Sequence, residues 1–518
     1  MGCFRRIFSR RSRRLPAGWL VVPVLVLLIL SGCGRGEVRE LTVIHTNDLH
    51  GHVLPTRVEG WTGRTGGYAT FVSWLNEVRR ENAEQDIPTL LLDAGDFFMG
   101  TVEGNLTRGA SVVRLMNLAG YDALAVGNHE FDYGFFNLFR LTEEADFPFL
   151  SANIFLRDTG EHPEFIHPYL IREYDGLKVG IIGVTVAETP ALTTAGTVSR
   201  VLFRDPAESV RPYLRLLRRE GADIIIVLSH LGLAGDRRLA EELEDIDLIV
   251  GGHSHDLLTR PERAGRKPTL IVQAGAYGRH AGRIDLRIDP EVKRIVGHRS
   301  EIFVNRQFSY PADLETNRLL VEIREEVGTG FDSTVGIALK DITGDSRRQS
   351  PLGSLITDAM RSRADAEAAF QNPYGIRGSL FQGSITRRDV YTVLPFDNSI
   401  VTMDLTGRKI RELLEQSLTL RKGLLQVSGL RVEYDPDRPE GRRVISVEIG
   451  DQPLEDDLHY RVSTNVFLAG GGDYFSTFTG GINRRDSGVL LRDAVADYIS
   501  QNTPLHPDFF NGERWRRR

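Results

Sequence analysis

The sequence has 518 residues, of which 41% are hydrophobic and 8% aromatic. This length exceeds what one hydrophobic core usually supports, and the apolar content is sufficient for two cores, so we expect two domains. The formal net charge is −6, with 64 Lys and Arg residues against 70 Asp and Glu spread along the chain. This balance excludes the basic surface that proteins binding nucleic-acid polymers present.

The N-terminus has the pattern of a secretory signal. Six arginines lie between positions 5 and 14, an apolar run extends from Trp19 to Leu30, and Ser31-Gly32-Cys33 follows. A bilayer-spanning helix needs about 20 apolar residues, so this shorter run disfavours a transmembrane helix. The tetrapeptide Leu30 to Cys33 resembles a bacterial lipobox, which implies that residues 1–33 form a lipoprotein signal, cleaved before Cys33, and that Cys33 is diacylated. We therefore expect a protein of the cell envelope, lipid-anchored outside the cytoplasmic membrane, in the periplasm or at the cell surface. The Arg-Arg pairs leave the export route open.

The folded part contains no cysteine, because Cys3 and Cys33 are the two in the sequence. A zinc-thiolate site, a disulfide and a cysteine nucleophile in that part are thereby excluded. Any metal chemistry must use His, Asp and Asn.

Short apolar runs alternate with helical patterns between residues 38 and 303, which predicts βαβ units around a buried sheet. The expected strands are Leu41–His45, Thr89–Asp93, Ala123–Val126, Lys178–Val184, Asp223–Leu228, Asp247–Val250 and Leu270–Val272. The expected helices are Tyr68–Glu81, Ser111–Ala119, Asn137–Glu144, Asp205–Arg219 and Arg237–Glu244.

The pattern changes after residue 303. Residues 304–336 hold a charged amphipathic stretch, Ala312–Val327, followed by glycines, which predicts an interdomain helix with a hinge. Residues 337–518 form a second domain, with a helix over Leu352–Ser362 and strands near Ser399–Leu405 and Arg443–Ile449.

Five of the expected strands end in side chains that bind metals. The five ends read Asp48-Leu49-His50, Asp93-Ala94-Gly95-Asp96, Gly127-Asn128-His129-Glu130, Ser229-His230 and Gly252-His253-Ser254-His255. A single His or Asp at such a place is usually a turn or capping residue. Five together, at the strand ends where α/β sheets build their sites, indicate a metal centre with imidazole and oxygen ligands, suited to Zn, Mn, Fe or Co.

The order D-x-H, G-D, G-N-H-E, a lone His after a strand and G-H-x-H resembles the calcineurin-like metallophosphoesterases, and the segment Gly127 to Asp132 resembles the 5'-nucleotidases among them. The resemblance implies a four-layer αββα metallophosphoesterase domain and a smaller α+β substrate-binding domain joined by a helix. It implies two divalent ions, one held by Asp48, His50, Asp96 and His255, the other by Asp96, Asn128, His230 and His253. Asp96 would bridge the two ions.

His129 and Asp132 would form a catalytic dyad. We expect Glu130 to be structural and Asp93 to be a strand-end turn carboxylate more than a partner of a metal-bound histidine.

Two segments of the second domain resemble the nucleoside-binding segments of the 5'-nucleotidases: Asn372 to Arg377 with the following Val393-Leu394-Pro395-Phe396, and Phe467 to Asp473. The resemblance implies that Phe396 and Phe467 sandwich a base, that Asp473 binds the ribose, and that Asn372 and Arg377 hold further substrate groups. Relatives usually have glycines in place of Pro373 and Tyr374. Arg347 or Arg348 resembles another substrate arginine, without a choice between them.

The hypothesis is therefore hydrolysis of nucleotides to nucleoside and phosphate by a metal-activated water, with 2',3'-cyclic nucleotides or UDP-sugars as further substrates. A non-nucleotide phosphoesterase or thiohydrolase on the same fold is one alternative, and a surface-anchored nucleotide-binding or adhesion protein without activity is another. The expected partners are the nucleotide and, through the lipid anchor alone, the membrane. The oligomeric state stays open.

Overall fold

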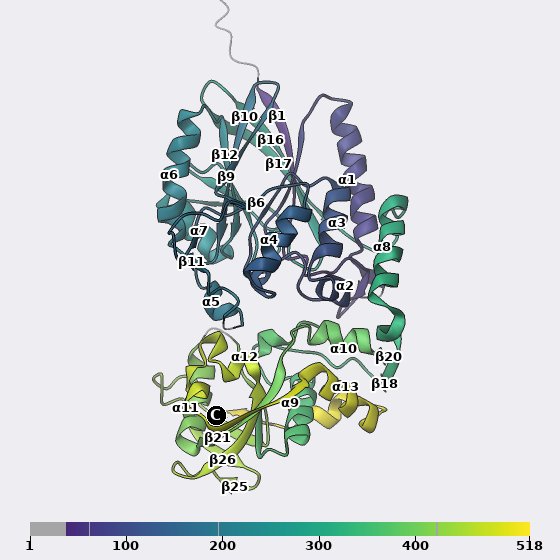
Figure 1. Cartoon of the computed structure of the whole chain (residues 1–518), viewed down its shortest axis with the longest axis vertical. Helices are drawn as coiled ribbons and strands as arrows, with labels where there is room; N and C mark the ends of the chain where they lie inside the picture. Colours follow the sequence, from purple (N-terminus) through teal and green to yellow (C-terminus); the bar gives the residue numbers. More distant parts are fainter. Residues whose placement is uncertain (1–37, 62, 195, 421–422) are drawn as a thin grey trace, which may run out of the picture.

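The computed structural model describes residues 38–518 except 62, 195 and 421–422. The predicted signal region and Cys33 lie outside the described residues. The chain forms an N-terminal α/β part and a smaller C-terminal part, and helix α8 (Leu314–Val327) runs along one side of the molecule from the first to the second (Figure 1). No helix among the described residues has both the length and the apolar content to cross a membrane.

Two sheets pack face to face in the N-terminal part. The first has the order β17 (Arg294–Val304), β16 (His280–Asp289), β1 (Arg39–Thr46), β4 (Thr89–Asp93), β5 (Ala123–Ala125), β6 (Phe149–Leu150) and β8 (Ile166–His167). The second has the order β14 (Glu262–Ala264), β15 (Thr269–Val272), β13 (Leu248–Gly251), β12 (Ile224–His230), β10 (Leu177–Thr185) and β9 (Tyr169–Tyr174). Within each sheet the central strands are parallel, so their carboxyl ends lie on one side.

The strands are apolar on both faces because both faces are covered. In β12, Ile224 and Ile226 belong to the core between the two sheets, whereas Ile225 packs toward the helices outside. The outer helices are α1 (Tyr68–Ala83), α3 (Ala110–Ala119) and α4 (Phe135–Glu144) on the first sheet, and α6 (Pro206–Arg219) and α7 (Leu233–Glu242) on the second. The predicted four-layer αββα architecture is confirmed.

Helix α7 begins four residues before its predicted start at Arg237. Gly232 and Gly235 have low helix propensity, so the sequence pattern does not predict the first turn of this helix. The turn is held from elsewhere in the chain, because the hydroxyl of Ser254 accepts a hydrogen bond from the Leu233 amide at 3.0 Å. This capping contact is tertiary and has no local sequence signal.

The C-terminal part is built on a five-stranded sheet of β22 (Gln426–Ser428), β19 (Ala368–Gln371), β26 (His459–Asn465), β21 (Ser399–Thr406) and β27 (Ile482–Leu490). Helices α9 (Pro351–Ala364) and α13 (Leu491–Asn502) pack on one face, and α11 (Gly407–Thr419) and α12 (Val466–Ala469) on the other. A four-stranded sheet of β25 (Gln452–Pro453), β24 (Val444–Ile449), β23 (Leu430–Tyr434) and β28 (Trp515–Arg517) adjoins it.

After α8 comes β18 (Thr334–Ala338), which pairs antiparallel with the distant β20 (Gly383–Thr386), and α10 (Arg387–Val393) follows β20 at the boundary with the N-terminal part (Figure 1). This places the loops after β19, α10 and β26 opposite the carboxyl ends of the N-terminal strands, where the candidate site lies.

Candidate metal centre and interdomain cavity

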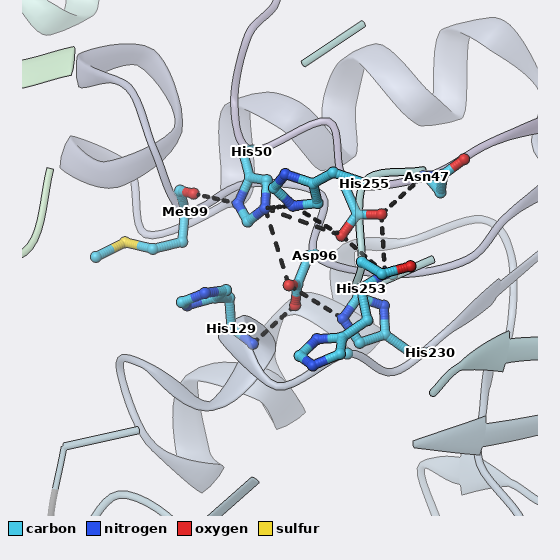
Figure 2. Close-up of polar contacts among 12 residues, drawn as sticks. Asn47, His50, Asp96, Met99, His129, His230, His253 and His255 are labelled. Carbon is cyan, nitrogen blue, oxygen red and sulfur yellow. Dashed lines mark hydrogen bonds and ion pairs between the residues drawn. The ribbon is translucent and has the colours of Figure 1, made fainter. Parts of the chain in front are cut away.

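The side chains at the five predicted strand ends converge on one point (Figure 2). They come from the ends of β1, β4, β5, β12 and β13. The metal-binding atoms of Asp48, His50 and His255 all lie within 4.8 Å of one another, and so do those of Asp96, His230 and His253. Asn128 lines the same cavity as Asp96 and His253. The structure therefore brings together every residue that the sequence suggested as a metal ligand.

Asp96 lies between the two groups. Its Oδ2 is 3.0 Å from His230 Nε2 in one group and 3.9 Å from His50 Nε2 in the other. Within the first group, His255 Nε2 is 3.4 Å from Asp48 Oδ1 and 3.1 Å from His50 Nε2. One carboxylate thus reaches both sets of ligands, as a bridging position requires.

Left-handed backbone makes this convergence possible. Five of the candidate ligands have positive φ: Asp48 at 50°, His50 at 50°, Asp96 at 57°, His253 at 72° and His255 at 58°. Such a conformation costs about 1–2 kcal/mol per residue outside glycine and persists where the surrounding structure imposes it. The strain is concentrated in the turns that aim these side chains at a common point.

Two histidines have their orientation set by main-chain carbonyls. His50 Nδ1 donates to Met99 O at 2.7 Å, and His230 Nδ1 donates to Ala94 O at 2.6 Å. Donation from Nδ1 turns the Nε2 of each ring toward the cluster, the arrangement that metal-ligating histidines adopt. Asn128 Oδ1 is buried and has no hydrogen-bond partner among the described residues, and the buried His230 Nε2 has only the carboxylate of Asp96 beside it, at 3.0 Å. A cation at this point would satisfy both atoms, so the donor set fits divalent metals.

The charges of the cluster also suit a cation. Burial alone would raise the pKa of Asp96, but the neighbouring His230 and His129 hold it well below its usual range. Burial and the nearby His230 lower the pKa of His253 to about 3. Burial alone would lower the pKa of His230 as well, but the carboxylate of Asp96 raises it to about 10. The cluster therefore offers an ionised carboxylate at Asp96 and a neutral imidazole at His253, and a cation would take the place of the proton that Asp96 holds on His230.

Glu130 supports the loop that carries Asp96. Its buried carboxylate accepts hydrogen bonds from the amides of Asp96 and Phe97, both at 3.0 Å, and from Gly127 at 2.6 Å. A Cβ at Gly127 would lie 2.3 Å from Asp96 Oδ1, so only glycine fits there. The structural role expected for Glu130 agrees with these contacts.

Asn47 supports Asp48 much as Glu130 supports the loop of Asp96, and the sequence did not predict this role. Its amide donates to Asp48 Oδ2 at 2.7 Å and to Gly275 O at 2.6 Å. Asp93 accepts hydrogen bonds from the Thr46 hydroxyl and the Gly95 amide, as a strand-end turn carboxylate does. The only signal for Asn47 was its place beside Asp48.

His129 and Asp132 form a close pair beside the cluster, with Nδ1 2.6 Å from Asp132 Oδ2. Burial alone would lower the pKa of His129, but the carboxylates of Asp132 and Asp96 raise it above its usual value. The ring also comes within reach of the ligand atoms of His50 and Asp96. His129 is thus oriented by a carboxylate and faces the same space as the ligands.

A cavity of about 770 Å³ opens from this cluster toward the C-terminal part. Its N-terminal wall includes Asp96, Asn128 and His129, and its C-terminal wall includes the residues of the two nucleoside-like segments. The members of the second group are Asn372, Arg377, Phe396, Phe467 and Asp473. All five predicted substrate residues therefore share one cavity with the metal cluster.

The phenylalanines have different surroundings. The Phe396 ring stacks on His129 with a centroid distance of 5.6 Å and an interplanar angle of 27°. The Phe467 ring lies against Gly472, where a Cβ would come within 2.5 Å of it. This contact explains one glycine of the Gly470–Gly472 cluster.

Asn372 is buried and already well bonded. Its amide donates to Asp473 Oδ2 at 2.8 Å, and its Oδ1 accepts from Asn465 at 3.0 Å and from Gln371 at 3.1 Å. Its clearest role in the structure is to hold Asp473. Neither Arg347 nor Arg348 lines the cavity; Arg348 instead pairs with Asp345 at 2.7 Å.

Comparisons with known proteins agree with this architecture. Residues 41–257 match the calcineurin-like phosphoesterase family, and residues 332–480 match the 5'-nucleotidase C-terminal domain family. A snake venom 5'-nucleotidase from Crotalus adamanteus is 33% identical, over 90% of this chain and 87% of its own. The crystal structure of a 5'-nucleotidase precursor from Thermus thermophilus is 33% identical with a TM-score of 0.85, covering 92% of this chain and 99% of its own.

A Thermus thermophilus sulfate thiohydrolase structure has a TM-score of 0.82 at 22% identity, over 93% of this chain and 97% of its own, and shares the fold. The full-length similarity to 5'-nucleotidases at higher identity, together with both family matches, decides the family. The chain belongs to the 5'-nucleotidase family of calcineurin-like metallophosphoesterases, which are hydrolases.

Proposed function

We propose that this protein hydrolyses nucleoside 5'-phosphates to nucleoside and phosphate at the junction of its two parts. The observation that carries the proposal is the shared cavity: candidate metal ligands form one wall, and two phenylalanines with a buried aspartate form the other. A phosphate bound at the first wall leaves its nucleoside within reach of the second. A generic phosphatase would not need the second wall.

The proposed ligand sets follow the two groups of side chains. One divalent ion would be held by Asp48, His50, Asp96 and His255, and a second by Asp96, Asn128, His230 and His253. Zn, Mn, Co or Fe suits these nitrogen and oxygen donors. When bound, two such ions supply positive charge that activates the attacking water and neutralises the phosphoryl oxygens.

The remaining residues orient the substrate and stabilise charge. Arg377 places a guanidinium beside the cluster, 3.1 Å from His50 Nε2, where it can meet phosphoryl oxygens. His129, oriented by Asp132, donates from Nε2 toward the same space. Phe396 and Phe467 stack the base, and Asp473, held by Asn372, accepts from the ribose hydroxyls.

Two further parts of the proposal concern place and motion. The signal pattern before Cys33 supports a lipid anchor that holds the protein outside the cytoplasmic membrane. The cavity is walled by both parts of the chain, so substrate entry and product release require the parts to separate about the segment of residues 304–336.

The test is phosphate release by the full-length protein from AMP, UMP, ATP, UDP-glucose and an aryl phosphate, after metal removal and restoration of single metals. We expect metal-dependent release from nucleotides and its loss in Asn128→Ala. Stacking contributes about 1–3 kcal/mol per base, so Phe467→Ala should raise KM for AMP by at least fivefold and leave the aryl phosphate unaffected.

Two outcomes would contradict the proposal. Metal-dependent release from the aryl phosphate with no preference for nucleotides would leave a phosphoesterase of another substrate class. Absence of release under every metal would favour a binding or adhesion protein.

A further inference from the structure

Tyr277 has an unusual backbone conformation beside the candidate metal centre. Its φ is 64°, and the neighbouring Gly275 and Gly278 also have positive φ. Glycine adopts such angles freely, whereas a large aromatic residue does so rarely and at a cost. The Tyr277 amide donates to Asp48 O at 2.8 Å, which ties this turn to the one that carries two candidate ligands. A strained residue in such a place suggests a function for its side chain.

The Tyr277 ring packs among histidines. Its centroid is 5.2 Å from that of His255 at an interplanar angle of 80°, and 5.6 Å from that of His50. On another side it contacts His52 at 4.7 Å, and the Arg279 guanidinium lies 4.9 Å from its centroid. The ring is therefore a wall of the cavity that touches two candidate ligands of the same ion.

His255 depends on such a wall more than His50 and His230 do. His50 and His230 are each anchored through Nδ1 to a carbonyl, and their side chains are fully buried. In the described part of the chain no hydrogen bond reaches His255 Nδ1, and 25% of the side chain is exposed. Among the described residues its ring contacts are the two edge-to-face contacts with Tyr277 and His50, while its Nε2 lies 3.1 Å from His50 Nε2 and 3.4 Å from Asp48 Oδ1. Packing against Tyr277 therefore supplies the support that a hydrogen bond at Nδ1 would otherwise give.

We propose that Tyr277 is a positioning residue that holds His255, and through it the affinity for the ion assigned to Asp48, His50, Asp96 and His255. The aromatic ring replaces the hydrogen bond that usually orients a ligating histidine. The ring contacts of Tyr277 among the described residues are with His50, His52 and His255 and do not include His230 or His253, so an ion held by Asp96, Asn128, His230 and His253 would not share this support. This inference rests on the proposed metal assignment and goes beyond it, because it gives the two ions different supports.

The experiment is calorimetric titration of the metal-stripped, full-length protein with Mn²⁺ alone, combined with thermal unfolding of the metal-free forms. Loss of a residue that orients a ligand typically weakens a metal about 10- to 100-fold. We expect Tyr277→Leu to weaken one of two sites at least tenfold and to leave the other unchanged. Tyr277→Phe, which keeps the ring, should bind within about twofold of the wild type.

Tyr277→Gly separates positioning from a merely structural role. Glycine lacks the ring, as leucine does, but relieves the positive φ, so the metal-free unfolding midpoint of Tyr277→Gly should be no lower than that of Tyr277→Leu while the same single site weakens. Phe308→Leu is the matched control, since Phe308 also has a positive φ, of 70°, but is 87% exposed on the surface. It should leave both metal affinities unchanged.

Several results would overturn the inference. Tyr277→Leu and Tyr277→Gly binding two ions like the wild type would show that the ring positions nothing. Equal weakening of both sites together with a fall in the unfolding midpoint would show a general structural role. Weakening by Tyr277→Phe as large as by Tyr277→Leu would assign the effect to the hydroxyl. A wild type that binds no Mn²⁺ would instead refute the metal assignment on which the proposed function rests.

Discussion

Arg377 Nη2, from the C-terminal part, lies 3.1 Å from His50 Nε2, from the N-terminal part. The His50 ring donates through Nδ1 to Met99, so its Nε2 offers a lone pair toward the guanidinium. Residues 327 positions apart in sequence thus meet at the candidate reaction centre. The contact shows that the C-terminal part contributes charge to the candidate metal centre as well as a wall to the cavity.

We expect Arg377→Met to lower kcat/KM for AMP about 100-fold, because a charge-assisted contact to the transferring phosphoryl group is lost. Steady-state kinetics at saturating metal would measure this. Arg347→Met is the matched control, since Arg347 does not line the cavity, and it should stay within twofold of the wild type. Equal effects of both substitutions would refute the assignment.

Replacement of His129 should affect catalysis and spare the metals. His129→Asn is expected to lower kcat about 10²- to 10⁴-fold, the range for a positioned acid or base, and Asp132→Asn to lower it less. Metal content measured on the same preparations should remain that of the wild type. Loss of one ion in His129→Asn would instead identify His129 as a ligand. This outcome is the alternative because the ring nitrogen of His129 lies close to the ligand atoms of Asp96 and His50.

An ion pair between Glu103 in α2 (Val102–Leu106) and Arg388 in α10 connects the two parts of the chain. The Glu103 side chain is 4% exposed, and Arg388 also donates from Nε to Asp332 at 2.8 Å. Removal of one partner of a buried pair leaves a buried charge uncompensated.

Arg388→Met should therefore destabilise the protein by about 3 kcal/mol, measured as a lower thermal unfolding midpoint. Adding Glu103→Gln should recover part of the loss. Arg408→Met, which breaks an exposed pair with Asp457, should change the midpoint little. A midpoint unchanged in Arg388→Met would show that the pair contributes nothing to stability.

Asp236 in α7 predicts a pH dependence of stability. Its carboxyl accepts from the Ser229 hydroxyl at 2.5 Å, its other oxygen has no hydrogen-bond partner among the described residues, and burial raises its pKa to about 7. Between pH 4 and 7 the unfolded chain loses this proton and the folded one keeps it. The free energy of unfolding therefore falls as pH rises through this window, by about 4 kcal/mol at most.

Asp236→Asn removes the titration. The variant should gain stability relative to the wild type at pH 8 compared with pH 5, measured by thermal unfolding at both values. Asp457→Asn, at a site 92% exposed, is the control and should show the same difference at both values. A pH-independent difference for Asp236→Asn would refute the prediction.

The candidate ligands could be predicted from sequence because an apolar run predicts each strand, and the ligands lie at the end of the run or directly after it. His230 is the last residue of β12, and Asp96 follows β4 by three positions. Parallel strands bring such ends to one edge of a sheet. The aromatic and acidic residues of the C-terminal part were predicted by resemblance to a family, since a Phe or Asp after a strand has no distinctive local pattern.

Asn47, Tyr277 and the pair of Glu103 with Arg388 could not be predicted. Each acts through a partner far away in sequence: Asn47 contacts Gly275, Tyr277 packs on His255 and His50, and Glu103 meets Arg388 across the two parts. The local sequence of these residues is also found in turns without function: a polar residue beside a ligand, or an aromatic residue between glycines, has no pattern that marks its role.

By itself, the sequence determined the two-part organisation, the αββα class, the metal-binding residue types and the family resemblance. These depend on local periodicity and on short motifs whose spacing is a property of the chain. The tertiary structure decided that both walls share one cavity, that Asn372 holds Asp473, and that His255 rests on Tyr277. Those relations depend on how strands and loops distant in sequence pack, and packing is a collective property that no short segment encodes.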